Sequence, residues 1–283
     1  MSIISLLVNK VFSDGDNKRD ENLSTPNNIV CYDDIVYGSD TKNNVLDVYR
    51  PKDNNEILPV IVSVHGGGWV YGNKQRYQYY CMDLALRGFV VINFTYRLAP
   101  KHKFPKQLED VCKVFEWLIE NKEKYNYDLN RLYAVGDSAG AHLLTLYCNL
   151  YTNSKYAYNF NFKAPILPRA IALNCGVYDV YPEKGIIKYL IKDFVSKDKL
   201  DLIDPLKNMN NKFPKAYVMT AIQDMLKNDS ILLIKRLAEL KIENEYHLYD
   251  NDTHDLAHVF HLNIRSSDAI KCNDDECEFF KRN

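Results

Sequence analysis

Hydrophobic and polar residues follow two patterns that alternate along most of the chain. Short runs are almost entirely apolar, as in strands that are buried on both faces of a sheet. Between them lie longer segments in which apolar residues recur every three or four positions, which is typical of helices that pack one face against a sheet. The predicted strands are residues 59–64, 89–94, 131–135, 170–174, 216–221 and 245–249. The predicted helices are 78–86, 106–123, a helix after residue 138 that ends near 152, 230–240 and 273–281.

This alternation predicts one α/β domain, with a mostly parallel central sheet and helices on both faces. Segments 29–37 and 44–49 alternate polar and apolar residues around a turn, and so predict a hairpin before the first buried strand. Residues 178–205 carry mixed Tyr, Lys and Asp without a strand pattern, so we expect a small helical cap inserted there between two core strands.

The first 28 residues predict an apolar helix followed by a polar connector. Two hypotheses stay open for this segment: it packs over the entrance of a site, or it is a frayed terminus. The expected organisation is therefore an N-terminal segment, 1–28, and a domain formed by residues 29–283 with its cap at about 178–205.

Composition excludes several classes of partner. The 36 Lys and Arg balance 37 Asp and Glu, so the net charge of −1 gives no reason to expect nucleic acid or an anionic membrane as a partner. Residues 1–10 are apolar but too short to span a bilayer, and they lack the features of a signal peptide. Seven cysteines, several inside apolar runs, predict buried free thiols in a reducing compartment. We therefore expect a cytoplasmic protein without a membrane span.

The motif Gly136-Asp137-Ser138-Ala139-Gly140 lies between a predicted strand and a predicted helix. A G-x-S-x-G motif at such a junction is typical of a nucleophile elbow, a turn too tight for side chains at either glycine. The turn exposes the serine hydroxyl above the edge of the sheet. The alternative is a chance pentapeptide in a loop. The functional interpretation makes Ser138 the nucleophile.

A second glycine motif makes the chance explanation a poor one. His65-Gly66-Gly67-Gly68-Trp69 follows the strand predicted at 59–64. Three glycines allow backbone N–H groups to turn toward a developing negative charge without a Cβ atom in the way. Both motifs follow strands, in the order that an acyl-transfer site requires.

A serine nucleophile needs a general base, and the base needs a carboxylate that orients it. In this fold class the acid follows the serine in sequence and the histidine comes last. Asp224 follows the strand at 216–221, while the alternative, Asp229, suits the first turn of the next helix. For the base we favour His258, with His254 as the alternative in the same loop. No histidine has the H-E-x-x-H spacing of a zinc site, so we expect neither a metal nor a cofactor.

The two glycine motifs, with Tyr96-Arg97-Leu98-Ala99-Pro100 between them, resemble the hormone-sensitive-lipase group of α/β-hydrolases. The similarity runs from about residue 58 to the end of the chain. It implies an α/β-hydrolase fold, an esterase of small acyl groups, and an oxyanion hole made by the backbone amides of Gly67, Gly68 and Ala139.

The resemblance also implies structural roles for Arg97, Glu109 and Asp110. One feature departs from the group: its usual His-Gly-Phe at the base is absent. This chain has His254-Asp255-Leu256 and His258-Val259-Phe260 instead.

These observations predict a serine carboxylesterase that hydrolyses short-chain, acetyl-type esters through an acyl-enzyme. An amidase or formamidase with the same triad is the alternative enzyme, and a non-catalytic ligand-binding receptor is the alternative from another class. The expected partner is a small-molecule ester. A homodimer is compatible with the sequence. The sequence leaves open the oligomeric state, the acyl-chain length and whether residues 1–28 form a lid.

Overall fold

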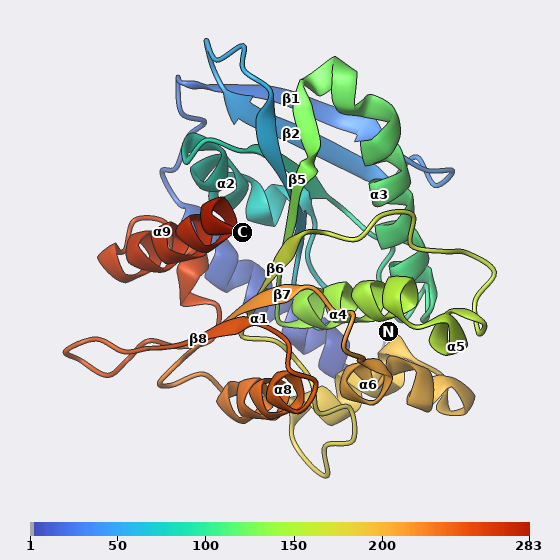
Figure 1. The fold of residues 1–283 in the computed structure, drawn as a ribbon. Coiled ribbons are helices and arrows are strands. Elements are labelled where there is room, and N and C mark those ends of the chain that lie inside the picture. The colour runs from blue at the N-terminus through green and yellow to red at the C-terminus, as the bar shows by residue number, and fades with distance from the viewer. Residues whose placement is uncertain (1–2) are drawn as a thin grey trace.

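The computed structural model describes residues 3–283 and is built around one sheet of eight strands (Figure 1). The strand order is β1-β2-β4-β3-β5-β6-β7-β8. The β1–β2 and β2–β4 pairs are antiparallel, and every pair from β4 to β8 is parallel. The strands are β1 (Ile29–Val36), β2 (Val45–Pro51), β3 (Leu58–Val64), β4 (Val90–Phe94), β5 (Tyr127–Asp137), β6 (Ala170–Asn174), β7 (Lys215–Ala221) and β8 (Asn244–Tyr249). The mostly parallel sheet predicted from the sequence is confirmed.

Helices cover both faces of this sheet, as Figure 1 shows for α2 and α9 on one side and α3 on the other. The strands supply apolar side chains to both faces because successive residues point in opposite directions. In β3, Val60 and Val62 join the core beneath α3 and α4, whereas Ile61 joins the core beneath α2 and α9. The covering helices are α2 (Lys74–Leu86), α3 (Lys106–Tyr125), α4 (Ala139–Thr152), α8 (Lys227–Glu239) and α9 (Ser267–Arg282).

Three helices begin earlier than their apolar pattern predicts: α8, at Lys227, and two helices whose first turns are capped by a side chain. Helix α2 begins at Lys74 because the Asn73 side chain accepts the amide of Arg76 at 3.1 Å. Helix α9 begins at Ser267 because the Ser266 hydroxyl accepts the amide of Asp268. Such caps lengthen a helix with polar residues that hydrophobic periodicity does not detect.

Two of the remaining helices come from distant parts of the sequence and pack against each other. Helix α1 (Ile3–Asp20) packs against α6 (Ile186–Phe194), which lies between β6 and β7 in sequence (Figure 1). The short elements are α5 (Ser154–Ala157), η1 (Lys197–Ile203), α7 (Pro205–Asn208) and η2 (Phe260–Leu262). No helix within residues 3–283 is both long and apolar enough to cross a membrane.

Candidate active site

Ser138 occupies a tight turn between β5 and α4. Its backbone lies in a region with positive φ (φ 51°, ψ −117°), which residues with side chains rarely adopt. A Cβ atom at Gly140 would overlap the carbonyl oxygen of Val64, and one at Gly136 would lie 2.7 Å from the Gly140 backbone. The Ser138 amide donates to the Asn174 carbonyl at 2.9 Å and so ties the turn to β6. Both glycines are therefore required for the serine to stand at this position.

His258 lies between the serine and a carboxylate. Its Nε2 is 3.1 Å from Ser138 Oγ, and its Nδ1 is 2.8 Å from Asp224 Oδ1. A carboxylate in that position fixes the imidazole tautomer and leaves Nε2 free to accept the serine proton.

Hydrogen bonds hold the Asp224 carboxylate in its charged form. Burial acts to raise its pKa, but the bond from His258 and the His258 charge, the Leu226 amide at 2.9 Å and the Thr220 hydroxyl at 2.7 Å outweigh burial. The pKa of Asp224 is therefore lowered to about 2. Thr220 is a member of this site that sequence reasoning did not single out.

The two alternative residues lie in other surroundings. Asp229 accepts the backbone amides of Tyr178 and Asp179 at 2.7 and 2.9 Å, and so anchors the start of the segment that leads to α6. His254 is largely exposed, and its Nδ1 lies 2.7 Å from Asp250 Oδ2. The structure thus brings His258 and Asp224 to Ser138, and it does not bring His254 or Asp229 there.

The glycine loop after β3 lies beside the serine. Gly67 and Gly68 have φ values of 104° and 59°, and both line the same cavity as Ser138. A Cβ atom at Gly67 would overlap the Tyr71 carbonyl, and one at Gly68 would lie 2.7 Å from Leu190 Cδ1. Ala139 is the first residue of α4, where an amide has no carbonyl partner within its own helix. These backbone positions suit the donors of an oxyanion hole.

The buried side chain of His65 supports this glycine loop. Its Nδ1–H donates to the Gly66 carbonyl at 2.8 Å, and its ring stacks on Tyr96 with centroids 4.0 Å apart. Burial lowers the pKa of His65 to about 4, so the ring is neutral at physiological pH. Arg97, for which a structural role was implied, donates to both carboxylate oxygens of the buried Asp110.

Asp137, the residue before the nucleophile, is a second carboxyl group in the site. It is 3% exposed, and its Oδ2 accepts the Tyr77 hydroxyl at 2.7 Å. The Tyr77 oxygen in turn accepts the Gly66 amide at 2.8 Å, which links Asp137 to the glycine loop. Burial raises the pKa of Asp137 to about 6.

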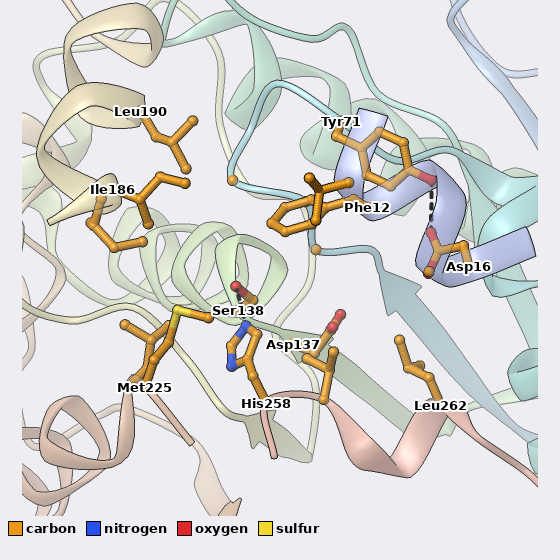
Figure 2. Close-up of a pocket in the computed structure, with 18 of the residues that line it drawn as sticks. Phe12, Asp16, Tyr71, Asp137, Ser138, Ile186, Leu190, Met225, His258 and Leu262 are labelled. Atoms are coloured by element: carbon orange, nitrogen blue, oxygen red, sulfur yellow. Dashed lines mark hydrogen bonds between the residues drawn. The ribbon is translucent and has the colours of Figure 1, made fainter. Parts of the chain in front are cut away.

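A cavity of about 340 Å³ opens above Ser138. Figure 2 shows Ile186, Leu190 and Met225 on one side of the serine, and Phe12, Tyr71 and Asp16 on the other. Sequence reasoning did not identify Phe12 or Asp16, because a helical pattern does not reveal where the helix docks. Their spacing of four residues on α1 was the available signal, since it places both side chains on one helix face.

Cys175 completes a set of three ligand-type side chains around the acid. Its Sγ atom and ligand atoms of Asp224 and His258 all lie within 4.8 Å of one another. The hydrogen bond between His258 and Asp224 already satisfies one atom of each partner, and burial raises the pKa of the Cys175 thiol well above its usual range. The closeness of Cys175, Asp224 and His258 is therefore explained by the contacts that join Asp224 and His258 to Ser138.

Comparisons with known proteins concern the family and the fold of the chain. Residues 61–258 match the model of a family described as having the alpha/beta hydrolase fold. The chain is similar to an alpha/beta hydrolase of Acanthamoeba polyphaga mimivirus (26% identity over 214 residues, 71% of this chain and 62% of that protein). It is also similar to an ethyl acetate hydrolase of Pseudomonas putida (37% identity over 105 residues, 36% of this chain and 33% of that protein).

The chain thus spans less than two thirds of the length of these curated relatives. Among solved structures, esterase B from Lactobacillus rhamnosis superimposes with a TM-score of 0.87 at 21% identity, covering 99% of this chain and 94% of that one. The fold expected from the sequence motifs is confirmed. With a family match that extends from within β3 to His258, the chain belongs to the alpha/beta hydrolase fold family.

Proposed function

We propose that the protein is a serine carboxylesterase that hydrolyses short-chain, acetyl-type esters, with Ser138, His258 and Asp224 as its catalytic residues. One observation carries the proposal: His258 makes both hydrogen bonds of a triad, at 3.1 Å to Ser138 Oγ and 2.8 Å to Asp224 Oδ1. A serine hydroxyl is a weak nucleophile unless such a base removes its proton.

The reaction then proceeds in two halves. Ser138 Oγ attacks the ester carbonyl carbon while His258 Nε2 accepts its proton, and the amides of Gly67, Gly68 and Ala139 stabilise the negative charge on the carbonyl oxygen. The alcohol leaves with the proton from His258, and an acyl-Ser138 ester remains. Water, deprotonated by His258, attacks this ester and releases the carboxylic acid and the serine.

The size and lining of the cavity support small acyl groups. A space of about 340 Å³ is near the lower end of ordinary ligand pockets. Ile186, Leu190 and Met225 offer apolar contacts to an acyl chain. The similarity to a relative named ethyl acetate hydrolase supports acetyl-type substrates.

Further predictions on the lid, the cap, the compartment and the oligomeric state belong to this proposal. We propose that the N-terminal segment, 1–28, acts as part of the lid, since Phe12 and Asp16 line the cavity, and that residues 178–205 act as the cap through α6. The seven unpaired cysteines suit a reducing compartment such as the cytoplasm. A homodimer stays a prediction.

The test uses p-nitrophenyl acetate with the wild type and with Ser138→Ala. We expect Ser138→Ala to lower kcat by roughly a thousandfold or more, while Ser24→Ala, at an exposed serine, serves as the matched control and stays near wild type. Activity of Ser138→Ala within about tenfold of wild type would refute the proposal. The matched amide, p-nitroacetanilide, distinguishes an esterase from an amidase.

A further inference from the structure

The two sides of the cavity differ in chemistry. The α6 side is apolar, with Ile186, Leu190 and Met225. The opposite side contains the aromatic rings of Phe12 and Tyr71 and the carboxyl groups of Asp16 and Asp137, as Figure 2 shows. We define these four residues as the acidic side of the cavity.

Asp137 places an unpaired carboxyl group on this side. It lines the cavity although only 3% of its surface is exposed, and it forms no ion pair with any residue of the described chain. Its hydrogen-bond partner Tyr77 is a neutral donor. The charges of His258 and Arg19 act on Asp137 without a direct ion pair. Because a buried carboxylate without a directly paired cation is costly, a cation that enters this space would gain a favourable charge pair.

Asp16 and the two rings lie on the same side. The Tyr71 hydroxyl donates to Asp16 Oδ2 at 2.7 Å, and the Phe12 and Tyr71 rings meet edge to face with centroids 5.7 Å apart. Arg19 pairs with Asp16 Oδ1 at 2.8 Å but also binds Asp20, and it does not line the cavity. Among the described lining residues there is no Lys or Arg. Aromatic rings combined with carboxylates are the groups that bind quaternary and primary ammonium ions.

We propose that the acidic side of the cavity is a subsite for an ammonium group carried by the ester substrate. The proposal rests on the proposed esterase function and adds its substrate class. The rings contact the alkylated face of the cation, while Asp16 and Asp137 supply the opposite charge. Esters that carry a carboxylate on this part of the molecule are repelled by the same two aspartates.

Substrate pairs that differ in charge but hardly in shape test this proposal. For a charge on the alcohol, acetylcholine is compared with 3,3-dimethylbutyl acetate. For a charge on the acyl group, methyl 4-(trimethylammonio)butanoate is compared with methyl 5,5-dimethylhexanoate. We expect kcat/KM of the cationic ester to exceed that of its neutral partner by roughly tenfold in the pair whose charged end occupies the subsite. Ratios within about twofold in both pairs would overturn the proposal.

The variant Asp16→Asn should lower the cationic-to-neutral ratio by roughly threefold to tenfold. Asp14→Asn is the matched control, because Asp14 is exposed on the same helix and does not line the cavity; it should keep the wild-type ratio. Equal ratios in the wild type, Asp16→Asn and Asp14→Asn would contradict a role for Asp16.

Direct binding separates failure of the subsite from failure of the esterase function. Butyltrimethylammonium is titrated into the full chain by calorimetry, which needs no turnover. Saturable binding that Asp16→Asn weakens would support the subsite even if no ester were hydrolysed, in which case only the proposed function fails. Hydrolysis of neutral esters without any ammonium binding would overturn the subsite and leave the esterase function intact.

Discussion

The Asn174 side chain donates a hydrogen bond to Glu276 Oε2 at 2.6 Å in the interior of the protein. The backbone carbonyl of the same asparagine accepts the amide of Ser138 at 2.9 Å. Glu276 also accepts the Tyr80 hydroxyl at 3.0 Å, and no cation pairs with it in the described chain. A fully buried carboxyl group thus supports the end of β6, on which the nucleophile turn rests.

Stability should depend on the protonation of Glu276. Burial raises its pKa from 4.5 to about 7, although its bonds from Asn174 and Tyr80 act in the opposite direction. Between these two values the folded protein holds a proton that the unfolded chain releases, so the free energy of unfolding falls as the pH rises from 4.5 toward 7. This loss in the free energy of unfolding is absent below the window and reaches roughly 3 kcal/mol above it.

Glu276→Gln removes this titration and keeps an acceptor for Asn174, while its NH2 group faces the Tyr80 hydroxyl, which then accepts instead of donating. The free energy of unfolding of Glu276→Gln minus that of the wild type should grow by about 2–3 kcal/mol from about pH 5 to about pH 8. Urea unfolding at both pH values measures this difference. Glu278→Gln, at an exposed position of the same helix, is the control, and a Glu276→Gln profile parallel to its profile would contradict the prediction.

Substitutions of the two histidines in the loop after β8 should differ clearly in their effect on activity. His258→Ala removes the only described imidazole within hydrogen-bond distance of Ser138 Oγ, so kcat on p-nitrophenyl acetate should fall by roughly a thousandfold or more. His254→Ala truncates an exposed ring bound to Asp250 and should stay within about twofold of wild type. A larger loss in His254→Ala than in His258→Ala would reverse the assignment.

Substitution of Asp224 should lower activity, whereas substitution of Asp229 should lower stability. Asp224→Asn keeps the shape of the side chain but loses the charge that orients His258, and kcat should fall by roughly 10³-fold to 10⁴-fold. Asp229→Asn loses the charge that holds the Tyr178 and Asp179 amides, and we expect a fall in stability of about 1–2 kcal/mol. Kinetics and urea unfolding of both variants check this, and a larger kcat loss in Asp229→Asn would contradict it.

The glycine loop should tolerate little bulk at Gly68. The Cβ atom of Gly68→Ala would lie 2.7 Å from Leu190 Cδ1 in a backbone with φ of 59°, so the loop should shift and kcat/KM should fall by roughly 10-fold to 100-fold. Gly185→Ala is the control, since its φ is also positive but no atom lies within 4 Å of the new Cβ. Adding Leu190→Ala to Gly68→Ala should restore part of the activity. A Gly68→Ala variant as active as Gly185→Ala would rule out the steric explanation.

The sheet and the serine turn were predictable because they depend on local sequence. Strands such as β3 and β4 are buried on both faces and therefore read as apolar runs, and the turn at Ser138 needs Gly136 and Gly140 wherever it occurs. The docking of α1 was not predictable, because it depends on contacts distant in sequence. Arg76, for example, donates to Ser13 and Asn17 from α2.

The choice between the two histidines also depended on a distant contact. The Gln223 amide donates to the Leu256 carbonyl at 2.9 Å, and Gln223 pairs with Ala257 in a parallel bridge. This bridge places Asp224 and His258, one residue beyond each partner, next to each other. Nothing in the local sequence around His254 or His258 records it.

Fluorophosphonate labelling with peptide mapping tests the central claim most directly, because the reagent modifies a serine only when a working base activates it. We predict one label per chain, on the peptide that contains Ser138, with no label in Ser138→Ala and labelling slowed by roughly a hundredfold or more in His258→Ala. A wild-type chain that stays unlabelled, or a label that persists in Ser138→Ala at the wild-type rate, would contradict the account.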